Sequence, residues 1–291
     1  MRGNPAMHDL VAPGTLGGVL ELLAAEPGAW TPIAGGTELM VAFAAGRLAA
    51  PKLVNLWGIP DLRAIEVSPQ NVVIGAAATF LDLRRHPVIA SDLPLLAKAA
   101  SWIGSVANQG RATLGGNLVN GSPAADSSPA LLAYDAEIEL ISTRGRRRIP
   151  YFEFHTGYKR NVLAADELIY AIHLPRRFAH HKQYLRKVGT RRAMAIAKVA
   201  LGATALLEKG VIREIRLGAA SLAPFPTRLL QTETALLGQA ITRETAQSAR
   251  RALLAEVKPI DDIRSTAHYR SRVAVNLLDE FLLQLRTEVS S

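Results

Sequence analysis

Apolar and polar positions follow the period of strands in the first third of the chain and the period of helices near its end. Short runs rich in Val, Ile and Thr, bounded by Gly, Pro or Asn, predict strands. The predicted strands of this part are residues 31–33, 51–56, 64–67 and 71–79. Apolar residues at helical spacing predict helices at 15–26 and from Asp92 onward, with Asp92 as the N-cap.

The middle of the chain predicts a helix at 126–134 and strands at 137–142 and 167–175. Residues 175–181 are charged and irregular, which indicates a linker between two domains at 1–176 and 183–291. After this linker, residues 198–222 predict a hairpin of two long strands that turns at 208–210.

The last helix, predicted at 266–286, carries an apolar stripe that we expect to pack against this hairpin. The stripe consists of Val273, Leu277, Leu278, Phe281 and Leu285. Strands followed by helices, without a regular βαβ alternation, predict an α+β fold rather than a doubly wound sheet.

Length and composition limit the class of protein. With 291 residues, 49% of them hydrophobic, the chain can bury a large core in two compact units. No apolar run reaches the roughly 18 residues of a membrane-spanning helix, and residues 1–10 lack the apolar segment of a secretory signal. We therefore expect a cytoplasmic protein without membrane insertion. The absence of cysteine excludes disulfides, thiolate zinc sites and Cys-ligated iron–sulfur clusters.

The formal net charge of +9 favours an anionic partner, such as a nucleic acid, an acidic protein or a phosphorylated cofactor. The densest basic run is RGRRR at 144–148, between the strand-like stretches EIELIS and RIPYFEF. Aromatic residues that could stack on bases are not interleaved with these arginines. We therefore favour a solvated hairpin tip or a docking patch over a nucleic-acid site.

Standard motifs of nucleotide binding, hydrolysis and metal binding are absent from the sequence. Nothing matches GxxxxGK[ST], no GxGxxG follows a strand, and neither HExxH nor GxSxG occurs. We therefore expect no metal site and no catalytic residue in this chain.

Two glycine pairs remain to be explained. Gly35 and Gly36 lie in TPIAGGTELM, and Gly115 and Gly116 lie in RATLGGNLVNGSPAADSS. Backbone N–H groups in such turns suit a phosphate or pyrophosphate, particularly where a helix begins. Tight turns with helix caps explain the same glycines, so the residues alone leave both interpretations open.

Polar side chains lie beside both glycine pairs. Thr37, Thr113 and Asn117 add donors, and Asp126 could accept hydrogen bonds from a sugar hydroxyl or an adenine amine. A dinucleotide would use both kinds of group, which favours a cofactor without excluding a structural role.

The two motifs together resemble a known family. AGGTEL at 34–39 and TLGGNLVNGSPAAD at 113–126 are similar to the FAD-binding medium subunit of the xanthine dehydrogenase and carbon monoxide dehydrogenase family of molybdenum hydroxylases. Later segments that resemble the family are ADELIYAIHLP at 165–175, RKVGTRRAMAIAKVALGA at 186–203 and KPIDDIRSTAHYRSRVAVNLL at 258–278. The resemblance covers nearly the whole chain.

This resemblance implies a fold and a set of site residues. The fold would be a two-lobed FAD-binding domain of the p-cresol methylhydroxylase type, with lobes at about 1–57 and 58–176, followed by a small α+β domain. The implied cofactor-binding residues are Pro32, Ile33, Ala34, Gly35, Gly36, Thr37, Glu38, Leu39, Ile103, Thr113, Leu114, Gly115, Gly116, Asn117, Asp126, Tyr170 and Lys187.

The resemblance also implies roles for these residues. The first loop would wrap the FAD diphosphate, and the second would close over it from the other lobe. Asp126 would contact the nucleotide portion, while Tyr170 and Lys187 would border the flavin ring. Ile103 stands where relatives carry an aromatic ring, which removes stacking but leaves an apolar contact.

In function, the resemblance implies an oxidoreductase subunit that binds FAD without a covalent link. A large molybdopterin-binding subunit would oxidise the substrate, and a small [2Fe–2S] subunit would relay electrons to FAD and then to NAD, dioxygen or a quinone. The complex is expected to be a dimer of heterotrimers. Because this chain lacks cysteine, it cannot ligate a cluster, so the clusters must lie on a partner subunit. The resemblance implies that the molybdenum cofactor also lies on a partner subunit.

Two other functions stay open from the sequence. A stand-alone FAD-dependent reductase or oxidase of the same fold would need an acid or base over the flavin, and the sequence offers no convincing candidate. A basic protein whose glycine loops hold RNA or a plain phosphate ligand would also fit the charge. Purification with or without a flavin spectrum separates the last function from the other two.

Overall fold

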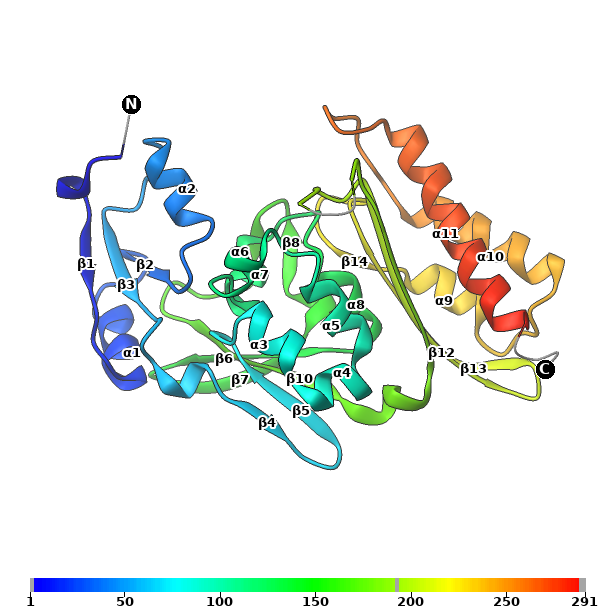
Figure 1. Ribbon diagram of the computed structural model, residues 1–291, viewed down its shortest axis with the longest axis horizontal. Coiled ribbons are helices and arrows are strands. Elements are labelled where there is room, and N and C mark those ends of the chain that lie inside the picture. Colours follow the sequence, from blue (N-terminus) through cyan, green and yellow to red (C-terminus); the bar gives the residue numbers. More distant parts are fainter. Residues whose placement is uncertain (1–2, 192–193, 288–291) are drawn as a thin grey trace.

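The structure is a computed structural model that describes residues 3–191 and 194–287 (Figure 1). One parallel sheet has the order β1 (Asp9–Val11), β3 (Lys52–Asn55), β2 (Trp30–Ile33). A second, antiparallel sheet has the order β4 (Ile65–Val67), β5 (Asn71–Gly75), β10 (Leu168–Pro175), β6 (Glu137–Ser142), β7 (Gly145–Pro150). A third, also antiparallel, has the order β11 (Lys182–Val188), β12 (Val199–Glu208), β13 (Val211–Ala220), β14 (Thr227–Arg228). A short ribbon pairs β8 (His155–Gly157) with β9 (Arg160–Asn161).

Helices cover these sheets along the chain (Figure 1). The α-helices are α1 (Leu16–Ala25), α2 (Leu39–Ala44), α3 (Phe80–Arg85), α4 (Pro87–Asp92), α5 (Pro94–Ala100), α6 (Val106–Gln109), α7 (Leu114–Asn120), α8 (Ser128–Ala133), α9 (Leu230–Leu236), α10 (Arg243–Glu256) and α11 (Ala267–Thr287). Short 3₁₀ helices are η1 (Pro5–Met7), η2 (Pro60–Leu62), η3 (Tyr151–Glu153) and η4 (Arg176–His180).

The N-terminal lobe is the parallel sheet with α1 packed against it. The hydroxyl of Thr15 accepts a hydrogen bond from the N–H of Gly18 at 3.2 Å and so caps α1. Val19 and Leu23 of this helix share a hydrophobic cluster with Val54 of β3. The predicted helix and strands of this lobe are confirmed to within two residues at their ends.

The second lobe is the antiparallel five-stranded sheet with its helices. Ile74 of β5, Phe80 of α3 and Leu96 of α5 belong to its core. The hydroxyl of Tyr134 accepts a hydrogen bond from the N–H of Leu95 at 2.9 Å, which satisfies a buried polar group. The order of strands and helices gives the mixed helix and sheet architecture that the sequence predicts.

One predicted helix start is wrong. Asp92 is the last residue of α4, and the next helix begins at Pro94. The carboxylate of Asp92 accepts hydrogen bonds from Ser91 at 2.6 Å and from Arg176 at 2.7 Å instead of capping α5. Proline at the start of α5 explains the break, because it fits a first helical turn but has no N–H to continue the preceding helix.

The C-terminal domain confirms the predicted hairpin and its helix. Strands β12 and β13 pair along their length and turn at Lys209 and Gly210. Leu278 and Phe281 of α11 are almost fully buried in the same cluster as Leu201 of β12. The apolar stripe of the last helix therefore packs on the hairpin, as its spacing predicts.

The basic run at 144–148 starts in the turn of the predicted hairpin, but residues 145–148 belong to strand β7, where Gly145 pairs with Ser142 of β6. Each of its four arginines faces a carboxylate of the chain, and two of them share Glu139. The ion pairs are Arg144–Asp166, Arg146–Glu139, Arg147–Glu167 and Arg148–Glu139. This run therefore contributes little of the free positive charge that could attract a partner.

The two domains meet where α8 lies on the third sheet. A Cβ built on Gly202 of β12, or on Gly218 of β13, would lie 2.6 Å from the carbonyl oxygen of Pro129 in α8. The hydroxyl of Thr204 donates to the carbonyl of Ala133 at 2.9 Å. Glycine at these two positions lets the helix backbone touch the sheet.

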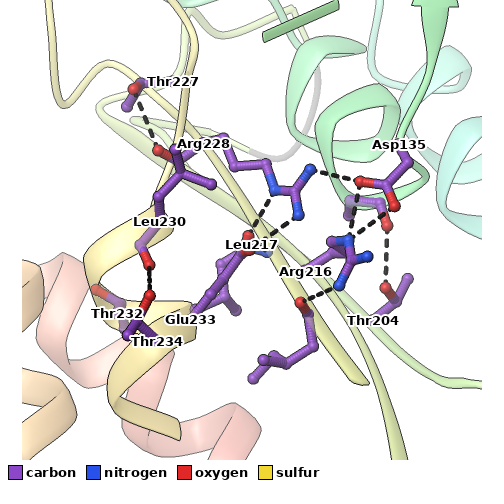
Figure 2. A network of polar contacts seen from close by, with 12 residues as sticks. Asp135, Thr204, Arg216, Leu217, Thr227, Arg228, Leu230, Thr232, Glu233 and Thr234 are labelled. Carbon is purple, nitrogen blue, oxygen red and sulfur yellow. Dashed lines mark hydrogen bonds and ion pairs between the residues drawn. The ribbon is translucent and has the colours of Figure 1, made fainter. Parts of the chain in front are cut away.

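An ionic network closes the same junction (Figure 2). The carboxylate of Asp135, just after α8, lies 2.7 Å from both Arg177 and Arg216 and also contacts Arg228. Arg228 in turn lies 2.7 Å from Glu233 of α9. One carboxylate of the second lobe thus holds arginines from η4, β13 and β14.

Candidate functional site

A cavity of about 490 Å³ lies between the two N-terminal lobes. Its walls come from β2 and the loop that follows it, from α7 and the loop before it, and from the start of β10. The predicted site residues that line it are Pro32, Ala34 to Leu39, Ile103, Thr113 and Gly115 to Asn117. The structure therefore brings both glycine loops to one cavity.

The two loops touch at Gly35. A Cβ built there would lie 1.6 Å from the carbonyl oxygen of Arg111, just before the second loop. Gly36 has a φ of +72°, in the left-handed region that favours glycine. The first glycine pair is thus fixed by a close backbone contact and by its turn.

The first loop also presents free donors. Among the described residues, no atom accepts a hydrogen bond from the N–H of Gly35, Gly36, Thr37 or Leu39, all of which line the cavity. The carbonyl of Gly36 accepts from the N–H of Met40 at 2.8 Å, which anchors the loop to α2. Backbone donors that face a cavity without a protein acceptor are available to a ligand, so this loop has the donor set that an anion such as a diphosphate would need.

The second glycine pair was also expected to offer backbone donors, but its N–H groups are already hydrogen-bonded within the chain. The N–H of Gly115 donates to the carbonyl oxygen of Ala76 at 2.8 Å. The N–H of Gly116 donates to the hydroxyl of Thr113 at 3.2 Å, which caps α7. The side-chain amide nitrogen of Asn117 remains available as a donor, since no described residue accepts a hydrogen bond from it. This loop therefore offers a side-chain donor and close packing, but few free backbone donors.

Ile33 and Leu114 flank the two loops without lining the cavity. Leu114 is fully buried in the core of the second lobe. Ile33 is the last residue of β2, and its carbonyl accepts from the N–H of Leu56 at 2.8 Å. Both residues hold the loops in place rather than face a ligand.

The apolar wall of the cavity was not identifiable from sequence motifs. It includes Leu23, Trp30, Leu56, Leu163, Leu168 and Ile169. Apolar walls of this kind accept the flat faces of heteroaromatic rings.

Tyr170 packs in the same hydrophobic cluster as Leu168 and Leu23, which line the cavity, but it does not reach the cavity itself. The guanidinium of Arg146 lies 4.0 Å from the centre of its ring. Tyr170 does not line the cavity, whereas its neighbours Leu168 and Ile169 do.

Asp126 and Lys187 form a buried ion pair outside the cavity lining. The Nζ of Lys187 lies 2.6 Å from Oδ2 of Asp126, and the two side chains are only 8% and 11% exposed. Burial raises the pKa of Asp126 to about 6, against the lowering effect of Lys187. The ring centre of Trp102 lies 6.0 Å from the same Nζ, next to Ile103 of the cavity wall. The pair therefore links the second lobe to β11 close to one side of the cavity.

Comparison with known families matches both parts of the chain. Residues 6–177 match the family described as the FAD binding domain in molybdopterin dehydrogenase. The chain belongs to this family. Residues 184–285 of the same flavin subunit match the CO dehydrogenase flavoprotein C-terminal domain.

Individual relatives agree with the family. The flavin subunit is 31% identical over 258 residues to the xanthine dehydrogenase FAD-binding subunit of Escherichia coli O157:H7, which covers 88% of each chain. It is 29% identical over 279 residues to the carbon monoxide dehydrogenase medium chain of Hydrogenophaga pseudoflava, which covers 96% of each. A solved structure of carbon monoxide dehydrogenase from that organism has a TM-score of 0.90 at 29% identity, covering 95% of this chain and 96% of that one.

The family assigns FAD as the cofactor and makes this flavin subunit a component of an oxidoreductase. The predicted fold, an FAD-binding domain followed by a smaller C-terminal domain, is confirmed. The donor loop and the apolar wall fit the diphosphate and the rings of this dinucleotide. In residues 3–191 and 194–287, no group of three His, Asp or Glu side chains is placed to hold a metal ion. No helix within the same ranges is long and apolar enough to cross a membrane.

Proposed function

We propose that the flavin subunit transfers electrons within a multi-subunit molybdenum hydroxylase. The observation that carries the proposal is the first glycine loop, whose free N–H groups line a cavity shared by two lobes of an FAD-binding family. When bound, FAD supplies the redox chemistry by which electrons from a [2Fe–2S] partner reach an acceptor such as NAD, dioxygen or a quinone.

The chain's own task in this proposal is to bind and orient the cofactor. The N–H groups of Gly35, Gly36 and Thr37 donate to the diphosphate, and Asn117 donates from the opposite lobe. Walls that exclude water strengthen each of these charge-assisted hydrogen bonds. Binding is non-covalent, because the chain has no cysteine and neither of the histidines near the loops, His86 and His155, lines the cavity.

The proposed site also includes three residues outside the cavity walls, namely Asp126, Lys187 and Tyr170. Since none lines the cavity, they would act where a ring extends beyond it toward β11. Lys187 is compensated by Asp126, so its field at a flavin is weaker than that of a lone cation. The test is the reduction potential of bound flavin in Lys187→Ala, and an unchanged potential would count against this role.

The organisation around the subunit follows from the same proposal. The partners are a large molybdopterin-binding subunit and a small [2Fe–2S] subunit, assembled as a dimer of heterotrimers in the cytoplasm. Domain limits at 1–176 and 183–291 are supported by two large hydrophobic clusters, one mainly in each domain. The proposed lobes at about 1–57 and 58–176 share a third cluster, in which Val19 and Val54 pack with Ile141 and Leu168. Residues 288–291 lie outside the described residues.

The experiment that tests the proposal is isolation of the native complex through a tag on this chain, followed by its visible spectrum and by cofactor analysis. We expect non-covalent FAD, iron and molybdenum in the complex, and flavin bleaching when the enzyme's substrate is added. A chain that carries FAD but turns over a simple substrate alone would instead indicate a stand-alone flavoenzyme. A colourless chain would contradict both.

A further inference from the structure

Positive charge without acidic partners gathers on one face of the second lobe. We call this the basic face and define it by Arg63, Arg84, Arg85, Lys98 and Arg111. All but Arg63 are exposed. Among the described residues, Arg84, Arg85, Lys98 and Arg111 have no carboxylate within ion-pair distance, and Arg63 has one, Asp82, at 3.6 Å.

Arg84 and Arg85 belong to α3 and Lys98 to α5, while Arg63 follows η2 and Arg111 follows α6. The helices α3, α5 and α6 lie together near the middle of the molecule (Figure 1). Arg84 of α3 donates to Gln109 of α6. A Cβ on Gly110, just after α6, would lie 3.8 Å from Leu81, and Arg85 lies one turn beyond Leu81 on the same face of α3. Arg63 and Arg111 both lie over the ring of Trp57, and the Nζ of Lys98 donates to the carbonyl oxygen of Leu185 in β11 at 2.9 Å, so the basic face extends from Trp57 toward β11.

The basic face borders the cavity. Gln109 donates from Nε2 to the carbonyl oxygens of Ser101 and Ile103 at 3.1 and 3.0 Å. Ile103, Gly104 and Asn108 line the cavity from the same segment. A molecule seated on the basic face would therefore lie next to the cofactor site.

Two tryptophans on this face are already covered by cations. Arg63 and Arg111 lie 4.8 and 4.0 Å from the ring centre of Trp57. The Nζ of Lys98 lies 5.8 Å from the ring centre of Trp102. Rings occupied in this way are poor platforms for stacked bases, so the face does not have the pattern of a single-stranded nucleic-acid site.

We infer that the basic face docks an acidic surface of the electron-donating [2Fe–2S] subunit. The inference rests on the proposed function and adds the surface and the charge of the partner to it. Uncompensated cations steer an acidic protein to the cavity edge and fix its orientation there. The paired arginines at 144–148 do not have this capacity, because each faces a carboxylate.

The test measures iron per FAD in the native complex, isolated through a tag on this chain at salt concentrations from about 50 to about 500 mM NaCl. For the wild type we expect iron to be lost as salt rises while FAD stays. In Arg85→Glu with Arg111→Glu, iron per FAD should fall about tenfold at the lowest salt, because like charges then meet across the interface.

Arg243→Glu with Arg251→Glu is the matched control, since both arginines are exposed on α10 of the other domain. It makes the same change in net charge and should keep wild-type iron. Arg85→Gln with Arg111→Gln should give a smaller loss in the same direction, which guards against misfolding of the charge-reversed chain.

Wild-type iron content and salt dependence in the folded charge-reversed variant would overturn this inference and leave the proposed function standing, provided that FAD is present. Equal iron loss in the α10 control would also overturn it, as would nucleic acid in place of iron on the wild type. Absence of FAD from every preparation would overturn the proposed function and this inference together.

Discussion

At the scale of single residues, Gly35 has the tightest constraint in the cavity. Its missing Cβ leaves room for the carbonyl oxygen of Arg111, which would otherwise lie 1.6 Å away. Gly35→Ala must push the two loops apart, and overpacking of this kind costs about 1–3 kcal/mol of unfolding free energy. We expect that loss in chemical denaturation, together with at least partial loss of bound FAD.

Gly58→Ala is the control for this change, because a Cβ there meets no atom within 4 Å. Its unfolding free energy and FAD content should stay at wild-type values. Full FAD occupancy in Gly35→Ala would show that the contact between the loops is not needed for binding.

Asp126 makes the unfolding free energy fall as the pH rises, whereas a carboxylate in an ion pair usually has the opposite effect. Burial raises its pKa from 3.8 to about 6. Between about pH 4 and 6 the folded chain keeps a proton there that the unfolded chain has lost. Its contribution is therefore present below about pH 4 and is lost as the pH rises through about 6. Asp126→Asn should remove this slope, measured as unfolding free energy against pH.

The wild type must be compared with this variant at each pH, because His155 acts in the opposite direction. Burial lowers the pKa of His155 to about 4, so its contribution is present above about pH 6.5 and is lost as the pH falls through about 4. The difference between the two curves isolates Asp126. Parallel curves would show that its carboxyl titrates normally in the folded chain.

Site residues with a backbone signature could be predicted from the sequence, and those without one could not. The pair at Gly35 and Gly36 marks a turn and a close contact, and the structure has both. The apolar wall has ordinary core residues, which carry no local mark of the cavity. Leu168 and Ile169 both line the cavity although they are neighbours on β10, and the pairing of β10 with β6 shifts register between Ile169 and Ala171. The resemblance alone does not fix such an irregularity.

At the scale of elements, long periodic segments were predictable and short helices were not. The hairpin of β12 and β13 and the stripe of α11 each repeat one pattern over ten residues or more. The region of α3 to α6 contains four helices of seven residues or fewer. Turns this short leave little periodicity, so Asp92 resembled the cap of one longer helix.

The network around Asp135 joins four elements and gives the next prediction. Asp135→Asn leaves three arginines at the junction without their common carboxylate, and Arg228 is nearly buried. Removing one partner of a largely buried ionic group costs about 3 kcal/mol of unfolding free energy. Thermal and chemical denaturation of the purified subunit should show this loss.

The matched control is Asp279→Asn, which removes a carboxylate from Arg250 at 2.7 Å in a more exposed pair. Exposed pairs contribute about 1 kcal/mol or less. If both variants lost the same small amount, the network at Asp135 would be an ordinary surface cluster rather than a joint between domains.

At the scale of the whole molecule, the formal charge of +9 predicted an anionic partner but not its place. The densest basic run in the sequence proved to be paired with neighbouring carboxylates. The cations of the basic face that lack an ion pair among the described residues are scattered between positions 84 and 111 and come together only in the fold. Charge patterns along a sequence therefore locate free charge poorly when acidic partners lie on other strands.

The contact of Pro129 with Gly202 and Gly218 bears on how the subunit can move. Hinge bending or shear at this joint would force the backbone of α8, with the Cβ of Leu132, over two strands that offer no side chains there to repack. The spacing between whatever occupies the interlobe cavity and the far domain is consequently set once, when the chain folds. An electron path that crosses this subunit would have a constant length, and its rate would vary with driving force rather than with conformational fluctuation.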